Sequence, residues 1–164
     1  KGLVRGLDNY QLNLDYDKIN AAHIDKEELK QVAMNYVKTL EGILSVVDMT
    51  KVSATTLPAD MKVLLNNSYN SSRSGEIQIL VKPGYFEVWS PEESMGTSHG
   101  VWAPYDLHIP LLFMGWGVRQ GQLNRTVHMT DIAPTLASLL HIQMPNGCVG
   151  HAIPEILSAA TLDK

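Results

Sequence analysis

The chain has 164 residues, of which 45% are hydrophobic and 18% are charged, and its formal net charge is −4. This length is sufficient for one domain with a buried core, and the composition excludes a disordered acidic segment. The small negative charge argues against nucleic acid as the main partner. The single cysteine, Cys148, excludes an internal disulfide. No apolar run reaches the roughly 20 residues that a transmembrane helix needs.

The first part of the chain predicts a strand, a helix and a second strand. Polar and apolar residues alternate over residues 10–15, as in a half-buried strand. Asp25 is a suitable N-cap for a helix with Glu27 and Glu28 in its first turn. Apolar residues then recur at spacings of three and four, which predicts an amphipathic helix ending near Gly42: Leu29, Val32, Ala33, Tyr36, Val37 and Leu40. Residues 43–47 predict a short second strand. A strand, a helix and a strand in this order indicate an α/β layer.

The middle of the chain predicts a short helix and a broken strand. Pro58 suits the first turn of a helix that continues to about Asn66. Residues 66–75 are rich in Asn, Ser and Gly and predict a loop. Residues 76–89 are apolar and favour β-structure, and we expect two strand segments separated at Pro83 and Gly84, because proline is tolerated only at a bulge or an edge.

The last part predicts one more strand and one more helix. The continuous apolar run over residues 109–114 is typical of a strand covered on both faces. Thr130 and Asp131 precede an apolar pattern at residues 132, 136, 139 and 140, which predicts a capped helix that tolerates Pro134 in its first turn. Residues 144–153 predict an ordered loop, and the whole chain one compact body.

Among the six histidines, at 23, 99, 108, 128, 141 and 151, no two have the short spacing that marks a zinc site. His99 differs in its surroundings. Gly96 and Gly100 permit positive φ and close approach of the backbone to a ligand. Thr97 and Ser98 offer hydroxyls and backbone N–H groups for contacts around a metal ligand. The pattern fits a metal-binding loop or a surface turn that contains a histidine.

Two further combinations of polar residues lie at or near His99. Ser98 beside His99 is rejected as a nucleophile with its base, because adjacent side chains seldom face each other and no acid is placed to orient the imidazole. Asp106 and His108 would share one side of a strand, which makes a ligand pair conceivable. The favoured interpretation is that these residues anchor the loop before a buried strand.

Several motifs together resemble the C-terminal part of the alkaline phosphatase superfamily. They are Gly-Thr-Ser-His-Gly at 96–100, Tyr-Asp-Leu-His-Ile-Pro-Leu-Leu-Phe at 105–113, Gly-Trp-Gly at 115–117 and Met-Thr-Asp-Ile-Ala-Pro-Thr-Leu at 129–136 with Leu-Leu-His-Ile at 139–142. Met-Pro-Asn-Gly at 144–147 with Gly150, and the run from Arg73 to Gly84, are similar to the bacterial periplasmic enzymes that use a threonine nucleophile. The resemblance is strong over residues 73–153 and weaker before them.

The resemblance implies a phosphomonoesterase with two zinc ions, in which a Thr or Ser attacks phosphorus and water hydrolyses the phosphoenzyme. His99 matches the last zinc ligand in chain order. The implied fold is a partial three-layer α/β sandwich with a mixed sheet flanked by helices. Residues 1–164 would be a single C-terminal fragment, with 1–72 as a cap or insert region and 73–153 in the catalytic fold. A periplasmic or secreted location is also implied.

The chain departs from that family in what it lacks. An early Asp ligand, the nucleophile, an Asp/His pair and an Asp-His-Gly segment do not occur in it, and we expect them before Lys1 in a missing N-terminal half. The fragment alone is therefore expected to bind zinc weakly and to be inactive, and an uncovered sheet face would favour self-association. The alternatives are a phosphodiesterase or sulfatase of the same superfamily, or a non-enzymatic binding or interaction domain.

Overall fold

The computed structural model describes residues 2–88 and 98–157. The chain divides into two compact units, Lys1–Ile109 and Pro110–Lys164, where the sequence predicted one body. Each unit has its own helices and buried side chains and is described by itself. The boundary near residue 72 and the assignment of the chain to one larger domain stay predictions.

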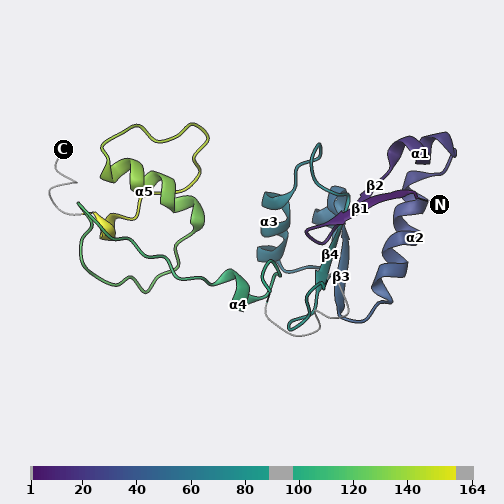
Figure 1. The fold of residues 1–164 in the computed structure, drawn as a ribbon, viewed down its shortest axis with the longest axis horizontal. Helices are drawn as coiled ribbons and strands as arrows, with labels where there is room; N and C mark the ends of the chain where they lie inside the picture. Colours follow the sequence, from purple (N-terminus) through teal and green to yellow (C-terminus); the bar gives the residue numbers. More distant parts are fainter. Residues whose placement is uncertain (1, 89–97, 158–164) are drawn as a thin grey trace. The chain divides into compact units, whose positions relative to one another are not determined.

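A four-stranded sheet in the order β1-β2-β4-β3 lies at the centre of the first unit (Figure 1). All three pairings are antiparallel, whereas a mixed sheet was expected. The turn between the first two strands uses Asn9 and Tyr10, both with positive φ, which suits the twist of a two-residue hairpin. The strands are β1 (Val4–Asp8), β2 (Gln11–Leu14), β3 (Ile43–Asp48) and β4 (Ile77–Val81).

The sequence predicted two helices of the first unit, one that begins after Asp25 and one that begins near Pro58. The Asp25 carboxylate accepts the Glu28 N–H at 2.8 Å and so caps the first of them as expected. The edge strand β1 and helix α1 were not predicted. The helices are α1 (Tyr16–Ala21), α2 (Lys26–Lys38), the 3₁₀ helix η1 (Met49–Ala54), α3 (Ala59–Ser68) and the single turn α4 (Pro104–Leu107).

Helices α2 and α3 lie on opposite sides of the β3–β4 pair (Figure 1), which makes three layers. On one face, Val46 and Ile79 pack with Val37 of α2. On the other face, Val47 and Leu80 join a cluster that contains residues of η1 and α3. Neighbouring residues of each strand thus enter different cores, which explains why both strands are almost continuously apolar. The predicted α/β class is confirmed.

Helix α2 buries only part of the stripe that its apolar pattern suggested. Val37 and Lys30 are buried, while Val32 and Tyr36 are 61% and 65% exposed. The apolar residues cover a wide arc of the helix, so periodicity alone leaves its rotation open. The buried ion pair between Lys30 and Asp48 of β3 selects the face that contacts the sheet.

The chain turns sharply after β4. The Tyr85 N–H donates to the Lys82 carbonyl at 3.1 Å, and the Lys82 N–H to the Gly42 carbonyl at 2.7 Å. Gly42 has φ +80°, and a Cβ there would lie 2.3 Å from the Tyr85 ring, so only glycine fits. The predicted break near Pro83 is confirmed, but residues 82–88 form no second strand, and residue 89 lies outside the described part of the chain.

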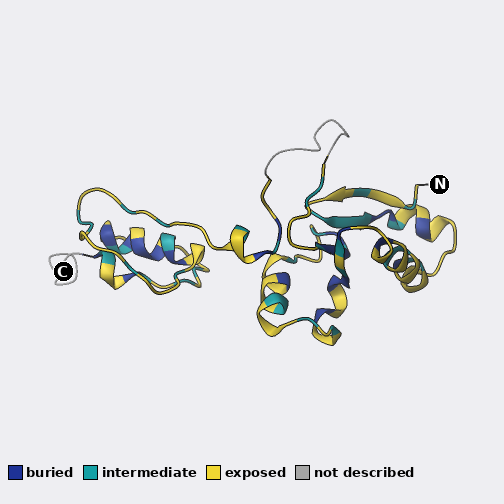
Figure 2. Cartoon of the chain, turned by 90° about the horizontal axis from the view of Figure 1, so that it is seen from below, coloured by how far each residue is buried: buried dark blue, intermediate teal, exposed yellow. Residues whose placement is uncertain are grey.

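Helix α5 (Ile132–Leu139) is the centre of the second unit and follows the 3₁₀ helix η3 (Met129–Asp131). Its dark blue residues in Figure 2 mark the buried side. The unit also contains the 3₁₀ helix η4 (Pro154–Ile156) and an isolated antiparallel bridge between Val118 and Leu157.

Two polar side chains tie α5 to the loop that follows it. The buried Thr135 hydroxyl donates to the Asp131 carbonyl at 2.6 Å and accepts the Ile153 N–H at 3.0 Å. The Asp131 carboxylate accepts the N–H groups of His128 and His151, each at 2.9 Å, and these bonds hold its pKa below the usual value. The loop over residues 144–153 is therefore ordered, as its sequence indicated.

The strand predicted over residues 109–114 is absent from the structure as described. Leu112 and Met114 are 89% and 99% exposed rather than covered. A strand requires a neighbour for its backbone N–H and C=O groups, and no described strand pairs with this run, which crosses the boundary between the two units. Throughout the two described ranges, no helix has the length and apolar content needed to span a bilayer.

Leu65 and its neighbour Leu64 provide a test of the three-layer core. Leu65 is 0% exposed in the cluster between α3 and the sheet, and Leu64 is 37% exposed. We expect Leu65→Ala to lower the free energy of unfolding by about 3 kcal/mol, because it leaves a cavity, and Leu64→Ala by less than about 1 kcal/mol. Urea denaturation followed by circular dichroism measures both, and equal losses would contradict this packing.

Candidate functional site

His99 lies on an exposed turn of the first unit. Ser98, His99 and Gly100 are all exposed, and Gly100 has φ +91°. No described atom beyond the adjacent residues lies within 4 Å of a Cβ placed on Gly100, so the surroundings of the turn are open. The backbone requirement predicted for Gly100 is therefore present, whereas Gly96 and Thr97 lie outside the described residues. His99 presents an imidazole that solvent can reach.

The chain enters the core directly after this turn. Val101 and Ala103 are buried, and Trp102 packs against the cluster on the α3 face. Helix α4 then begins with Pro104 at its first position, where proline is well suited. The residues beyond His99 are thus held by burial, while His99 itself remains exposed.

Asp106 and His108 do not form the ligand pair that a strand would have made possible. Asp106 lies in α4 and His108 is its C-cap, and residues two apart on a helix do not share a face. The Asp106 carboxylate instead accepts the Val101 N–H at 2.8 Å. Asp106 fastens the chain two residues beyond His99, in agreement with the favoured interpretation of an anchored loop.

The other histidines have structural surroundings. His23 and His141 are exposed, with φ of 54° and 53°, in turns that follow α1 and α5. His128 and His151 donate their backbone N–H groups to Asp131. Among residues 2–88 and 98–157, no three or more His, Cys, Asp or Glu side chains form a group that could hold a metal ion.

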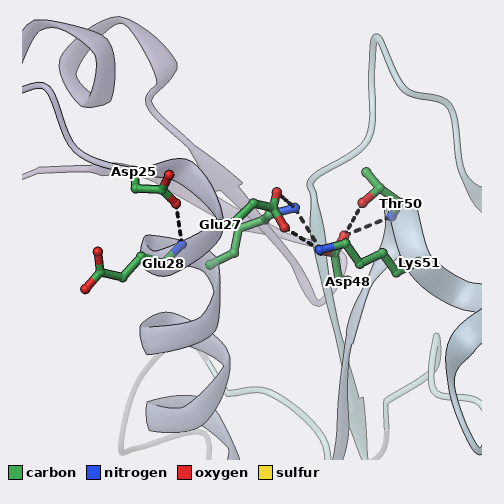
Figure 3. Close-up of polar contacts among 7 residues, drawn as sticks. Asp25, Glu27, Glu28, Asp48, Thr50 and Lys51 are labelled. Carbon is green, nitrogen blue, oxygen red and sulfur yellow. Dashed lines mark hydrogen bonds and ion pairs between the residues drawn. The ribbon is translucent and has the colours of Figure 1, made fainter.

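A cluster of charged side chains lies between α2 and β3 (Figure 3). Lys30 Nζ lies 2.8 Å from Asp48 Oδ2 and 2.6 Å from Glu27 Oε1. Lys51 also pairs with Glu27, and its Nζ lies 3.7 Å from Asp48 Oδ2. The Thr50 N–H and hydroxyl donate to Asp48 Oδ1 at 3.0 and 2.6 Å.

These ion pairs determine the protonation of the cluster. Burial disfavours the charged form of Asp48, but bonds from Lys30 and Thr50 hold its pKa below the usual value. Burial likewise opposes the charge of Lys30, but its bonds to Asp48 and Glu27 raise its pKa. The cluster lines a cavity of about 420 Å³. In the described chain, no buried side-chain nitrogen or oxygen lacks a partner, so these groups stabilise the fold rather than present free reactive atoms.

The second unit has a smaller cavity of about 290 Å³, lined by residues 119–123 with Glu155 and Ile156. Arg125 binds Glu155 through two hydrogen bonds, from Nε at 2.9 Å and from Nη2 at 2.8 Å. This two-point contact lowers the pKa of Glu155 to about 2. Both groups are engaged with each other, so this pair also has a structural role.

Comparison with known proteins assigns a family to this arrangement. No protein-family model matches the chain. It is 42% identical over 149 residues to alkaline phosphatase PhoV of Synechococcus elongatus, and equally to alkaline phosphatase PafA of Elizabethkingia meningoseptica, each over 91% of this chain. The crystal structure of wild-type PafA matches the fold with a TM-score of 0.89 at 39% identity, over 96% of this chain. The chain belongs to the alkaline phosphatase superfamily.

The resemblance drawn from the motifs is therefore confirmed at the level of the superfamily, and the α/β fold is a part of a larger one. The chain spans 26% of the length of PhoV, 27% of PafA and 30% of the PafA chain in the crystal. It is also 41% identical over 155 residues to a protein of Myroides odoratus named calcium-transporting ATPase, of which it spans 28%. About a quarter of each relative is represented, so the activity of the whole protein is a matter of proposal.

The Lys30–Asp48 pair was missed from the sequence, although one signal for it exists. A lysine stands within the apolar stripe of a predicted helix, and an aspartate ends a predicted buried strand. Buried charges are usually paired, so the two residues are natural partners once both elements are placed. What the sequence lacks is the rotation of α2 that brings them together.

We expect Asp48→Ala to lower the free energy of unfolding by about 2 kcal/mol, because Lys30 loses a buried partner but keeps Glu27. The pKa of Asp48 is lowered in the folded state, so its stabilising effect is complete above about pH 4 and is lost as the pH falls further. Urea denaturation between pH 2.5 and 7, in about one-unit steps, should therefore show a weaker loss of stability at acid pH in Asp48→Asn than in the parent chain.

Asp8→Asn, on the exposed edge strand β1, is the control for a change of charge alone. The same acid dependence in Asp48→Asn and in the parent chain would contradict the assignment of this pH effect to Asp48.

Proposed function

We propose that the chain is part of a zinc-dependent alkaline phosphatase that hydrolyses phosphate monoesters through a phosphoenzyme. The observation that supports it is the 42% identity to PhoV and PafA over 91% of the chain, together with the match to the PafA fold. From the resemblance we further propose a periplasmic or secreted location for the parent protein.

Among the described residues, His99 is the zinc ligand that we propose. An imidazole nitrogen is a good zinc donor, and His99 presents one on an exposed segment of the chain. Within the described ranges, no three or more His, Cys, Asp or Glu side chains come together as a metal site. Stable protein zinc sites use three or four protein ligands. The remaining ligands and the nucleophile are therefore proposed to lie in other parts of the parent protein.

In the proposed reaction, a Thr or Ser hydroxyl of the parent attacks phosphorus and the substrate alcohol leaves. Water then attacks the phosphoenzyme, which releases inorganic phosphate and restores the hydroxyl. Zinc, when bound, supplies a Lewis acid that favours the ionised oxygen and balances charge on the leaving group. The role of this chain is to hold His99 at a defined place, on a turn anchored by the buried residues Val101 and Ala103.

We propose that the rest of the parent protein covers the exposed apolar side chains near the unit boundary. Leu112, Met114 and Trp116 are 89%, 99% and 80% exposed. Large uncovered apolar side chains favour association. The isolated chain is accordingly proposed to associate with itself.

The isolated 164-residue chain should not hydrolyse p-nitrophenyl phosphate, with or without added zinc, because we propose that the nucleophile and the remaining zinc ligands lie in other parts of the parent protein. Absorbance of released nitrophenol measures turnover, with an intact alkaline phosphatase as the positive control, and sedimentation velocity of the same sample tests self-association. Turnover by the pure chain would contradict the proposal that its active site is incomplete. A strictly monomeric sample would contradict the proposed self-association.

In the intact enzyme, His99→Ala should lower zinc content and phosphomonoester turnover together, with a fall in kcat/KM of about 100-fold or more because a direct ligand is lost. Metal analysis and steady-state kinetics measure the two effects. His108→Ala is the matched control, since His108 is an exposed histidine at the C-cap of α4. Unchanged zinc in His99→Ala would remove His99 from the site, and faster turnover of a phosphodiester or a sulfate ester would reassign the substrate.

A further inference from the structure

The chain on either side of residues 89–97 is fastened to the same short helix, α4. Before this segment, the Gly84 N–H donates to the Tyr105 hydroxyl oxygen at 2.9 Å. After it, the Val101 N–H donates to Asp106 Oδ2 at 2.8 Å. Adjacent residues of α4 therefore bind backbone amides that are 17 positions apart in the sequence. The Tyr105–Asp106 contacts are called the α4 clamp below.

Helix α4 is itself fixed to the end of the buried segment. The N–H groups of Asp106 and Leu107 donate to the Ala103 carbonyl at 2.9 and 3.1 Å, and Ala103 is buried. Pro104 at the first helical position has a restricted φ, which limits the ways in which the turn can open. The side chains of the clamp thus extend from a backbone with little freedom.

His99 is exposed and lies two residues before the buried Val101. Val101, two residues away, is buried and held by Asp106, while His99 and Gly100 are exposed. Gly100 is in the left-handed region at φ +91° and sets the direction of the chain between them. Loss of the Val101 contact would release the backbone that carries the imidazole.

We infer that Asp106, assisted by Tyr105, is a positioning residue for His99. Asp106 acts on His99 indirectly, through the Val101 amide that its Oδ2 accepts. The expected effect on zinc binding rests on the proposed function, in which His99 is a zinc ligand. The clamp itself is a property of the fold, and groups that orient a metal ligand commonly affect metal affinity about 10–100-fold.

The first measurement is amide hydrogen exchange in the 164-residue chain, which involves neither metal nor activity. Asp106→Ala should accelerate exchange of the Val101 amide about tenfold. Asp106→Asn keeps a carbonyl oxygen as acceptor and should stay within about threefold of the parent chain. Tyr105→Phe should accelerate exchange at Gly84 about threefold, a smaller effect because that bond is exposed.

Two controls separate the clamp from a general loss of stability. The Ile79 amide, bonded to the Tyr10 carbonyl at 2.8 Å, should exchange at the parent rate in every variant. Tyr36→Phe removes an exposed tyrosine hydroxyl from α2 and should leave Gly84 unchanged. Unchanged Val101 exchange in Asp106→Ala would overturn the clamp, and if that variant does not fold, Tyr105→Phe tests it at Gly84 in the same way.

The second measurement is the zinc dissociation constant of the intact enzyme. Asp106→Ala should raise it about tenfold and Asp106→Asn should restore it to within about threefold. An equal loss in both variants would overturn the inference and indicate that the charge of Asp106 is required. Faster Val101 exchange with unchanged zinc affinity would also overturn positioning. Unchanged zinc in His99→Ala removes His99 from the proposed metal site but leaves the α4 clamp standing, because exchange at Val101 does not depend on metal.

Discussion

The antiparallel pairing of β3 with β4 is the contact on which the first unit depends, since both strands are covered on both faces. Neighbouring residues of each strand pack against different helices, α2 on one side and α3 on the other. A shift of one residue in register would exchange the two apolar sets and move Asp48 away from Lys30. The same pairing places the turn after β4, where Gly84 meets Tyr105 of α4.

The ion-pair cluster of the first unit and His99 have contrasting surroundings. Lys30, Asp48 and Glu27 bind one another and have shifted pKa values, features that often mark a functional site. Here the shifts arise from structural ion pairs. The surroundings of His99 are different: its imidazole is exposed, and the backbone nearby is held through Val101. His99, which a ligand can reach, therefore lies outside the cluster of Glu27, Lys30 and Asp48.

Elements with a strong local signal were predicted correctly, and those that depend on a partner were not. The cap at Asp25 and the apolar spacing that follows it predicted α2, and Pro134 was correctly allowed in the first turn of α5. Strand β1 lies at the sheet edge with mostly exposed residues, so it has little apolar alternation to recognise. The run over residues 109–114 has the composition of a buried strand but no described partner, and composition cannot supply one.

The sequence by itself determined the superfamily and named His99 as the candidate ligand, because motifs are carried by the order of residues along the chain. It also suggested that residues 105–108 anchor a loop, but not by which atoms. The tertiary structure decided that Asp106 binds the Val101 amide and that Lys30 faces the sheet. These contacts depend on the rotation of each helix about its axis and on where the chain reverses direction. Both are determined by packing between side chains that are distant in sequence, which no local pattern encodes.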